Sequence, residues 1–205
     1  MSLRNSRLGN IYYNILQRFI LAKIKKGPIN PDKITIIGGI IALFVPLGFY
    51  LSELLGGLLI LISAVCDSLD GQFARKFGGN EKFGAFLDST MDRLSDFFYL
   101  MGLWVVALQT QNKIVLTLLL FIALCLTLLF SYTKARIEGL GGTCNIGFME
   151  RAKRVIFILI LSILLFFFNQ DTLLFYSMII YNLLLAFSVY QRILCAKEVL
   201  TQIYE

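Results

Sequence analysis

The chain has 205 residues, of which 58% are hydrophobic and 16% are charged, and its formal net charge is +6. With a mean hydropathy of +0.76, it has too few polar side chains to cover a soluble globule of this length, so we expect an integral membrane protein. The absence of histidine removes the commonest general base and the commonest transition-metal ligand. Acid–base chemistry would therefore rely on carboxylates, lysine or tyrosine.

The first segment, residues 1–28, mixes basic and apolar residues and lacks the uninterrupted apolar core of a signal peptide. Read at helical period, one face carries Leu8, Ile11, Tyr12, Ile15 and Phe19. This pattern predicts an N-terminal amphipathic helix on the cytoplasmic membrane surface, with Arg and Lys near anionic headgroups. A disordered basic leader is the alternative.

Six apolar runs follow, at about 33–52, 54–66, 94–111, 114–133, 155–169 and 172–190. They reach the roughly 20 residues of a membrane-spanning helix, in some cases only with a flanking motif included. Most Lys and Arg lie in the termini and in two connections, which places both termini in the cytoplasm. We predict an all-α integral membrane protein with six transmembrane helices, residues 29–205, in the cell membrane. The positive charge follows this distribution and needs no nucleic acid to explain it.

Charged residues gather between the second and third runs, in residues 67–92. Residues three or four apart share one face of a helix, and here that face would carry Asp67, Asp70, Gly71, Ala74 and Arg75. After a glycine-rich turn, the four-residue spacing returns at Gly84, Asp88 and Asp92. A short hairpin is thus expected to bring two acidic helix faces together.

These aspartates need compensation, since a charge near the bilayer centre costs about 2.5–3.5 kcal/mol on insertion scales. A buried ion-pair network is one reading, but such networks add little stability. Carboxylates without soft ligands instead predict Mg²⁺ or Mn²⁺, and four acids can hold two ions that act on a phosphoryl transfer. Gly71 and Ala74 leave room for a phosphate to approach, and Arg75 offers several donors to a diphosphate.

A second polar set lies at the cytoplasmic side of the last three runs, namely Ser131, Lys134, Arg151, Arg154 and Arg192. A lone arginine in such a place is more often a snorkelling interface residue. Several of them behind the aspartates instead predict a cationic pocket for an acceptor that itself carries phosphate.

The four cysteines show no paired spacing, and three of them lie in apolar runs. They are Cys66, Cys125, Cys144 and Cys195. We interpret them as small core residues and predict neither a disulfide nor a zinc site.

The spacing D-x2-D-G-x2-A-R-x8-G-x3-D-x3-D, met at every position from Asp67 to Asp92, resembles the signature of the CDP-alcohol phosphotransferase family. The resemblance implies a membrane enzyme that transfers a diacylglycerol- or archaeol-phosphate group from a CDP-linked lipid to an alcohol and releases CMP. It implies that Asp67, Asp70 and Asp88 are metal ligands. Asp92 would be both a ligand and the catalytic base.

The same resemblance implies contacts to the CDP-lipid from Gly71, Ala74 and Arg75 and, more loosely, from Asn30, Pro31, Asp32, Lys33 and Glu81. The stretches FGAFLDSTMDR, SYTKAR and ERAKR are similar to the branch that makes phosphatidylinositol phosphate or archaetidylinositol phosphate. That branch implies inositol 1-phosphate as the acceptor, with its phosphate held by Ser131, Lys134, Arg154 and Arg192. The resemblance also suggests a homodimer.

Two alternatives remain open. Glycerol 3-phosphate is the rival acceptor for the same chemistry, because it too would suit a cationic pocket. A cation or proton transporter is the rival from another class, since intramembrane aspartates can line an ion path. That reading predicts broken helices or inverted repeats, and neither is visible in the sequence.

Overall fold

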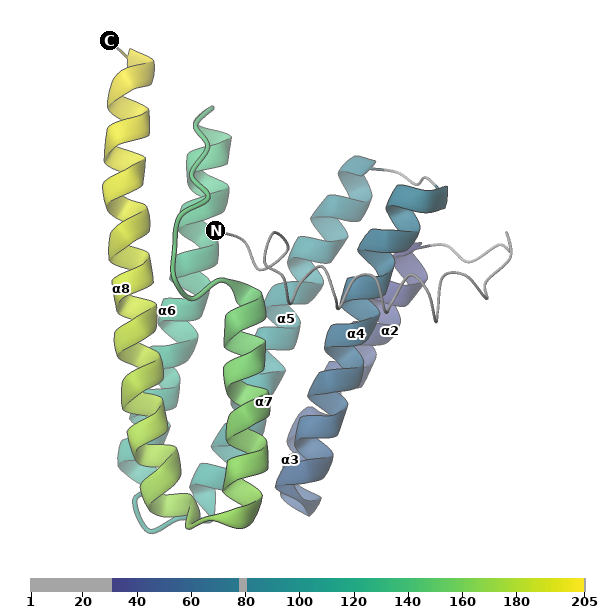
Figure 1. The fold of residues 1–205 in the computed structure, drawn as a ribbon, viewed down its shortest axis with the longest axis vertical. Coiled ribbons are helices and arrows are strands. Elements are labelled where there is room, and N and C mark those ends of the chain that lie inside the picture. The colour runs from purple at the N-terminus through teal and green to yellow at the C-terminus, as the bar shows by residue number, and fades with distance from the viewer. Residues whose placement is uncertain (1–30, 78–80, 205) are drawn as a thin grey trace.

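The structure, a computed structural model, describes residues 31–77 and 81–204, and within them it contains helices but no strands. Figure 1 shows them as a bundle of roughly parallel rods. They are α2 (Pro31–Leu43), α3 (Val45–Leu51), α4 (Glu53–Phe77), α5 (Glu81–Leu108), α6 (Lys113–Gly139), α7 (Arg151–Phe167) and α8 (Gln170–Tyr204). The predicted surface helix over 1–28, Asn30 and the glycine-rich turn at 78–80 lie outside the described residues.

The first predicted run forms two helices in place of one. Pro46 stands in the first turn of α3, and because proline has no backbone N–H, the α-helical bond to the carbonyl four residues earlier is lost. The chain closes the junction with a tighter bond from Phe44 N to Ile41 O, 3.1 Å long, before helical bonding resumes from Gly48 N to Phe44 O at 2.9 Å. The break therefore follows from one residue within an otherwise apolar segment.

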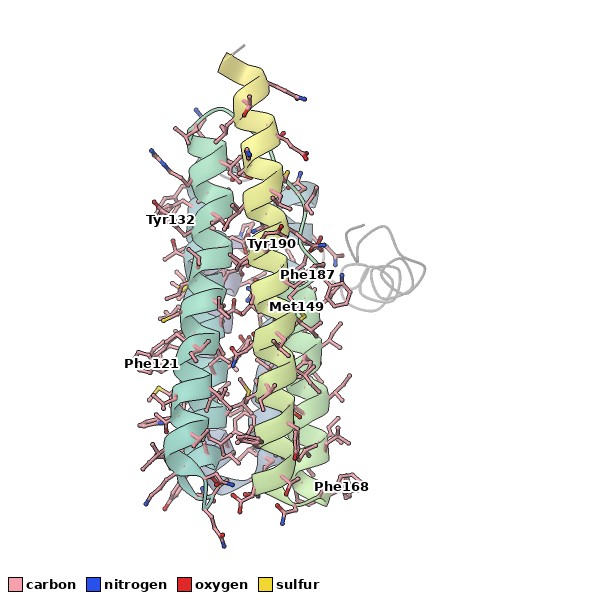
Figure 2. The ribbon with its side chains drawn as sticks, turned by 90° about the vertical axis from the view of Figure 1, so that its left-hand side faces the viewer. Phe121, Tyr132, Met149, Phe168, Phe187 and Tyr190 are labelled. Atoms are coloured by element: carbon pink, nitrogen blue, oxygen red, sulfur yellow. A yellow bond between two sulfur atoms is a disulfide. The ribbon has the colours of Figure 1, made fainter. Side chains whose placement is uncertain are left out.

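Within the described residues, four segments are long and apolar enough to cross a membrane, judged by length and composition alone. They are Pro31–Leu51, Glu53–Phe73, Lys113–Gly139 and Gln170–Gln202. Large apolar side chains cover the outside of the bundle, and Figure 2 shows Phe121, Tyr132 and Phe168 pointing away from it, with 65%, 62% and 63% of their surface exposed. These features confirm a helical membrane protein, while the count of six spans stays a prediction.

The helices that carry the aspartates are joined by a chain of hydrogen bonds deeper in the bundle. Tyr99 on α5 donates to Ser63 Oγ on α4 at 2.8 Å, and Ser63 donates to the carbonyl of Gly38 on α2, also at 2.8 Å. Gly38 makes this approach possible, because a Cβ there would lie 3.1 Å from Cys66 Cβ. Asp67 lies one turn beyond Ser63 on α4, so this packing sets the position of the acidic face.

The connection between α6 and α7 runs back along α8 before α7 begins (Figure 1). Met149 N donates to Ser188 Oγ at 2.9 Å, and Phe148 N donates to Gln191 Oε1 at 3.2 Å. Arg192 Nε donates to Ile146 O at 3.1 Å. The α8 residues in these contacts are spaced three and four apart, so they share one helix face, and this face fixes the start of α7.

A disulfide between Cys144 and Cys195 joins the same connection to the same face of α8, with Cα atoms 6.3 Å apart. The prediction that no cysteine is cross-linked is therefore wrong for this pair. The two cysteines are separated by 51 residues, and they meet only because the α6–α7 connection folds back against α8. Cys66 and Cys125 are free thiols, and because Cys125 is exposed, its assignment as a core residue is wrong.

Candidate active site

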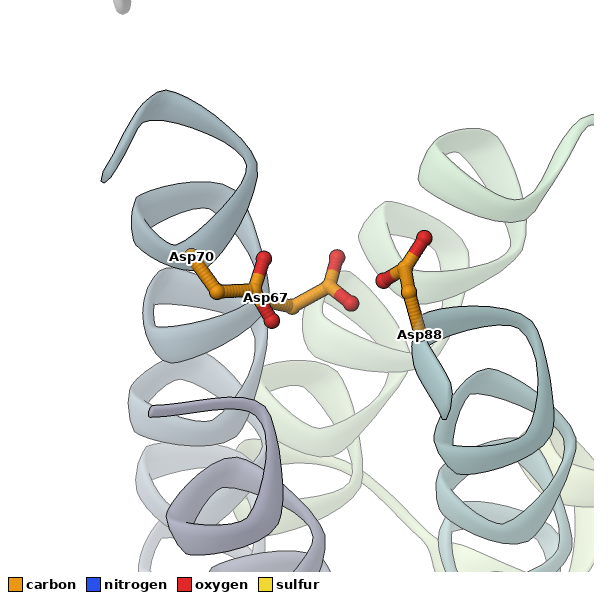
Figure 3. A group of neighbouring side chains, drawn as sticks. All are labelled: Asp67, Asp70 and Asp88. Atoms are coloured by element: carbon orange, nitrogen blue, oxygen red, sulfur yellow. The ribbon is translucent and has the colours of Figure 1, made fainter. Parts of the chain in front are cut away.

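Three carboxylates from two helices converge at the predicted motif. Asp67 and Asp70 extend from α4 and Asp88 from α5, and their side chains point toward one another in Figure 3. One carboxylate oxygen from each lies within 4.8 Å of the others. The prediction that the hairpin brings two acidic faces together is confirmed, and it follows from the three- and four-residue spacings of these acids.

Asp92 lies one turn further along α5 and is linked to this group through Arg151. Arg151 Nη1 lies 2.7 Å from Asp67 Oδ2 and also contacts Asp92 Oδ1. Its Nε is 3.9 Å from Asp96 Oδ1. Arg151 was predicted to bind the acceptor phosphate, whereas here it compensates the charge of these aspartates. Its role toward an acceptor stays a prediction.

The acidic group fits a hard divalent cation. Among the described residues, neither Asp70 nor Asp88 forms an ion pair with lysine or arginine, and Asp70 is only 4% exposed. A buried carboxylate without a counter-charge is costly, so Asp70 favours a positive ligand, to which Asp67 and Asp88 can add further carboxylate oxygens. Clustered carboxylate oxygens are the ligands that Mg²⁺ and Mn²⁺ prefer.

A buried ion pair connects the acidic helix to α7. Arg154 Nη2 lies 2.6 Å from Asp96 Oδ2, and the two side chains are 3% and 7% exposed. Arg154 Nη1 also donates to the carbonyl of Met149 at 3.1 Å. Sequence reasoning gave Asp96 no role, although it continues the four-residue spacing of Asp88 and Asp92, and that spacing was the signal that could have revealed it.

The structure brings the predicted Arg154 and Arg192 together around Phe130 on α6. The guanidinium carbon of Arg192 lies 3.5 Å from the centroid of the Phe130 ring, and that of Arg154 lies 5.7 Å from it. Both arginines are at most 4% exposed, so neither snorkels to the membrane interface. Ser131 is the residue after Phe130 and is half-buried. Lys134 lies 3.8 Å from Glu138 on the exposed side of α6.

Residues 29–190 match the family model described as CDP-alcohol phosphatidyltransferase. The chain belongs to this family. It is 41% identical over 137 residues to the archaetidylinositol phosphate synthase of Pyrococcus horikoshii, an alignment that covers 66% of this chain and 70% of the relative. It is 36% identical over 138 residues to the phosphatidylinositol phosphate synthase of Mycobacterium tuberculosis, covering 64% and 61% of the two chains.

Solved structures of the Mycobacterium tuberculosis phosphatidylinositol phosphate synthase share the fold. The crystal structure with CDP-DAG bound superposes with a TM-score of 0.72 at 28% identity, over 91% of this chain and 92% of that one. The structure in complex with manganese and citrate gives a TM-score of 0.73, over 91% and 87%. The CDP-alcohol phosphotransferase class inferred from the aspartate spacing is thereby confirmed.

The predicted donor residues of this phosphatidyltransferase lie near the aspartates where the structure describes them. Pro31, Asp32 and Lys33 form the first turn of α2. A Cβ at Gly84 would be 3.6 Å from Asp32 Oδ1, which places this turn against α5. Gly71 follows Asp70 on α4, and the backbones of Ala74, Arg75 and Glu81 are helical, but the side chains of those three lie outside the described part.

Thr35 is a site residue that sequence reasoning missed. It is 7% exposed on α2, and its hydroxyl donates to Asp70 Oδ2. Nothing in the local sequence marks it, because the contact depends on how α2 packs against α4. By this hydrogen bond Thr35 orients a carboxylate of the predicted metal site.

We expect Thr35→Val to raise the Mg²⁺ concentration needed for half-maximal activity by about 10- to 100-fold, the size expected when a hydrogen bond that orients a metal-binding carboxylate is removed. Valine keeps the branched shape and removes only the hydroxyl. Titration of CMP release against Mg²⁺ measures the effect. Thr201→Val is the control, because the exposed Thr201 hydroxyl donates to Lys197 O on its own helix, at 2.7 Å. An unchanged Mg²⁺ requirement in Thr35→Val would show that Asp70 does not need this contact.

Proposed function

We propose that this enzyme transfers a diacylglycerol- or archaeol-phosphate group from a CDP-linked lipid to inositol 1-phosphate and releases CMP. One observation carries the proposal: two buried arginines, Arg154 and Arg192, contact the same aromatic ring, and Arg154 pairs with Asp96, one turn beyond Asp92 on α5. Arginine forks suit the geometry of a phosphate. The two synthase relatives, whose names specify inositol phosphate products, support the same acceptor.

The metal part of the proposal rests on the acidic group. Asp67, Asp70, Asp88 and Asp92 would hold two Mg²⁺ ions, with Mn²⁺ as a possible substitute, and the manganese complex of the mycobacterial relative supports this. When bound, such ions neutralise the diphosphate and stabilise the leaving group. Arg75, one turn beyond Gly71 on α4, would add donors to the same diphosphate.

The reaction itself needs a base close to the acceptor. Asp92 would take the proton of the acceptor hydroxyl, and the oxygen would form a bond to the lipid-linked phosphorus while the bond from this phosphorus to CMP breaks. CMP leaves with the electron pair. Arg151 supports this role by contacting Asp92 and Asp67 at once, which fixes the direction of the Asp92 carboxylate. Arg154 lies one turn further along α7, so the pocket is next to the base.

The membrane arrangement is part of the proposal. Six spans would place the aspartates and arginines at the cytoplasmic side of the cell membrane, with both termini in the cytoplasm and residues 1–28 on its surface. There a lipid donor and a water-soluble acceptor can meet. A homodimer is proposed from the family resemblance, and its mass in detergent tests it.

The acceptor is tested by measuring CMP release from CDP-diacylglycerol or CDP-archaeol with Mg²⁺. Separate reactions receive inositol 1-phosphate, glycerol 3-phosphate, inositol or serine. We expect inositol 1-phosphate to react with a kcat/KM at least about 100-fold above that of inositol, because a buried cationic pocket left without its phosphate is costly. Arg192→Met should reduce this preference, whereas Arg136→Met, an exposed change on α6, should not.

Two results would contradict the acceptor assignment. Preference for glycerol 3-phosphate would keep the chemistry and change the acceptor. Equal kcat/KM values for inositol and inositol 1-phosphate would show that the enzyme has no pocket for the acceptor phosphate.

A further inference from the structure

Phe130 occupies a central place in the predicted pocket although its side chain has no polar atom. It is 4% exposed near the cytoplasmic end of α6. Its ring contacts the guanidinium groups of Arg154 and Arg192, and its carbonyl accepts a hydrogen bond from Arg192 Nη1. Both cations of the pocket thus share one neighbour.

Gly147 fixes the ring from the side of the α6–α7 connection. Its φ of +146° is one that side-chain-bearing residues rarely adopt, and a Cβ there would lie 2.5 Å from both Cε2 and Cζ of Phe130. The same Cβ would be 3.5 Å from Arg192 Nη2. Any side chain at position 147 would therefore displace the ring, while the contact with the arginine would be an ordinary one.

The remaining contacts of the two arginines leave donors for a ligand. Arg154 Nη1 donates to Met149 O and Nη2 to Asp96, while the buried Nε has no hydrogen-bond partner among the described residues. Arg192 uses Nε on Ile146 O and Nη1 on Phe130 O. A buried donor without a partner is costly, so the Arg154 Nε is a position where an anion would be stabilised.

We propose that Phe130 is a positioning residue that sets the spacing and orientation of Arg154 and Arg192 for the phosphate of the acceptor. The inference rests on the proposed function. Two like charges in a low-dielectric site repel each other. Arg154 is held by Asp96 and one carbonyl and Arg192 by two carbonyls, and these separate sets of bonds do not set the distance between the two guanidinium groups. The negative face of an aromatic ring attracts both cations and gives each a surface to stack on.

This arrangement makes acceptor binding dependent on an apolar side chain. Without the ring, Arg154 keeps Asp96 and Arg192 keeps its two carbonyls, so both arginines stay buried and bonded. Their relative orientation is then no longer fixed. We therefore expect a defect in binding the phosphorylated acceptor and none in binding the CDP-lipid.

Two variants displace the ring in different ways. Phe130→Leu removes the aromatic face and keeps a large apolar side chain, while Gly147→Ala pushes against the ring and keeps the ring itself. Phe49→Leu is the matched control, because Phe49 is also buried, at 2%, but packs against Gly56 and Gly102 away from the arginines. For each protein, kcat, the KM for inositol 1-phosphate and the KM for CDP-lipid are measured separately.

We expect the acceptor KM to rise by about 10-fold in Phe130→Leu and Gly147→Ala, with kcat and the donor KM within about two-fold of the parent. Phe49→Leu should leave the acceptor KM unchanged even where it lowers the melting temperature. This split separates positioning from a general loss of packing, which would lower the amount of active enzyme without selecting one substrate.

The outcomes distinguish the proposed function from the proposed role of Phe130. If the parent enzyme uses inositol as well as inositol 1-phosphate, the proposed function fails first. If the parent requires the phosphate but the acceptor KM is unchanged in both variants, the role of Phe130 is refuted and the proposed function stands. If Phe130→Leu does not fold, the acceptor KM of Gly147→Ala decides alone.

Discussion

Asp92→Asn should lower kcat by about 1,000-fold while the affinity for CDP-lipid stays within about three-fold. Asparagine has nearly the same shape as aspartate but cannot accept the proton of the acceptor hydroxyl. The three-carboxylate group of Asp67, Asp70 and Asp88 remains complete in this variant, so the donor should still bind. Single-turnover CMP release gives the rate, and equilibrium binding of the CDP-lipid in the presence of Mg²⁺ gives the affinity.

The control for this variant is Asp171→Asn, at the start of α8. Asp171 Oδ1 accepts a hydrogen bond of 2.9 Å from Gln111 N in the turn before α6, at the opposite end of the bundle from the aspartates. Its loss should leave kcat unchanged. If Asp92→Asn lost CDP-lipid binding together with turnover, Asp92 would be chiefly a metal ligand, and the base would have to be sought among other residues.

The acidic site was predictable because its geometry is local. Asp67 and Asp70 are three residues apart on α4, so helical periodicity places them on one face, and Asp88 lies on α5, the next helix along the chain. The helices were also predictable, because an apolar run of this length forms a helix when it crosses a membrane. The break at Pro46 was equally local, although the apolar character of the run concealed it.

The partners of the arginines could not be predicted in the same way. Asp96 and Arg154 are 58 residues apart in the sequence, and Phe130 and Arg192 are 62 residues apart. The first contact depends on the height at which α7 starts, which the α6–α7 connection sets by folding back along α8, and the second depends on how α6 packs against α8. The Cys144–Cys195 disulfide was missed for the same reason. Spacing within a helix carries no information about such a fold-back, so the sequence predicts a phosphate pocket without showing what orients its arginines.

Arg151→Met is expected to lower the free energy of unfolding by about 1.5–3 kcal/mol when divalent cations are chelated, the range for hydrogen bonds to charged groups, since these side chains are 20–30% exposed. Arg151 contacts Asp67 and Asp92 and lies 3.9 Å from Asp96. Methionine keeps the apolar stem and removes the charge, so these carboxylates lose their shared counter-charge. Thermal unfolding in detergent with EDTA measures the loss.

Mg²⁺ should restore part of the stability of Arg151→Met, because a cation bound by the same carboxylates offsets their charge. Arg136→Met, an exposed change on α6, should show neither the loss nor the restoration. Equal destabilisation with EDTA and with Mg²⁺ would mean that Arg151 acts through packing alone. If Mg²⁺ stabilises Arg151→Met more than it stabilises the parent protein, the arginine and the metal ion act on the same aspartates. Only groups that compensate the same charge can substitute for each other in this way.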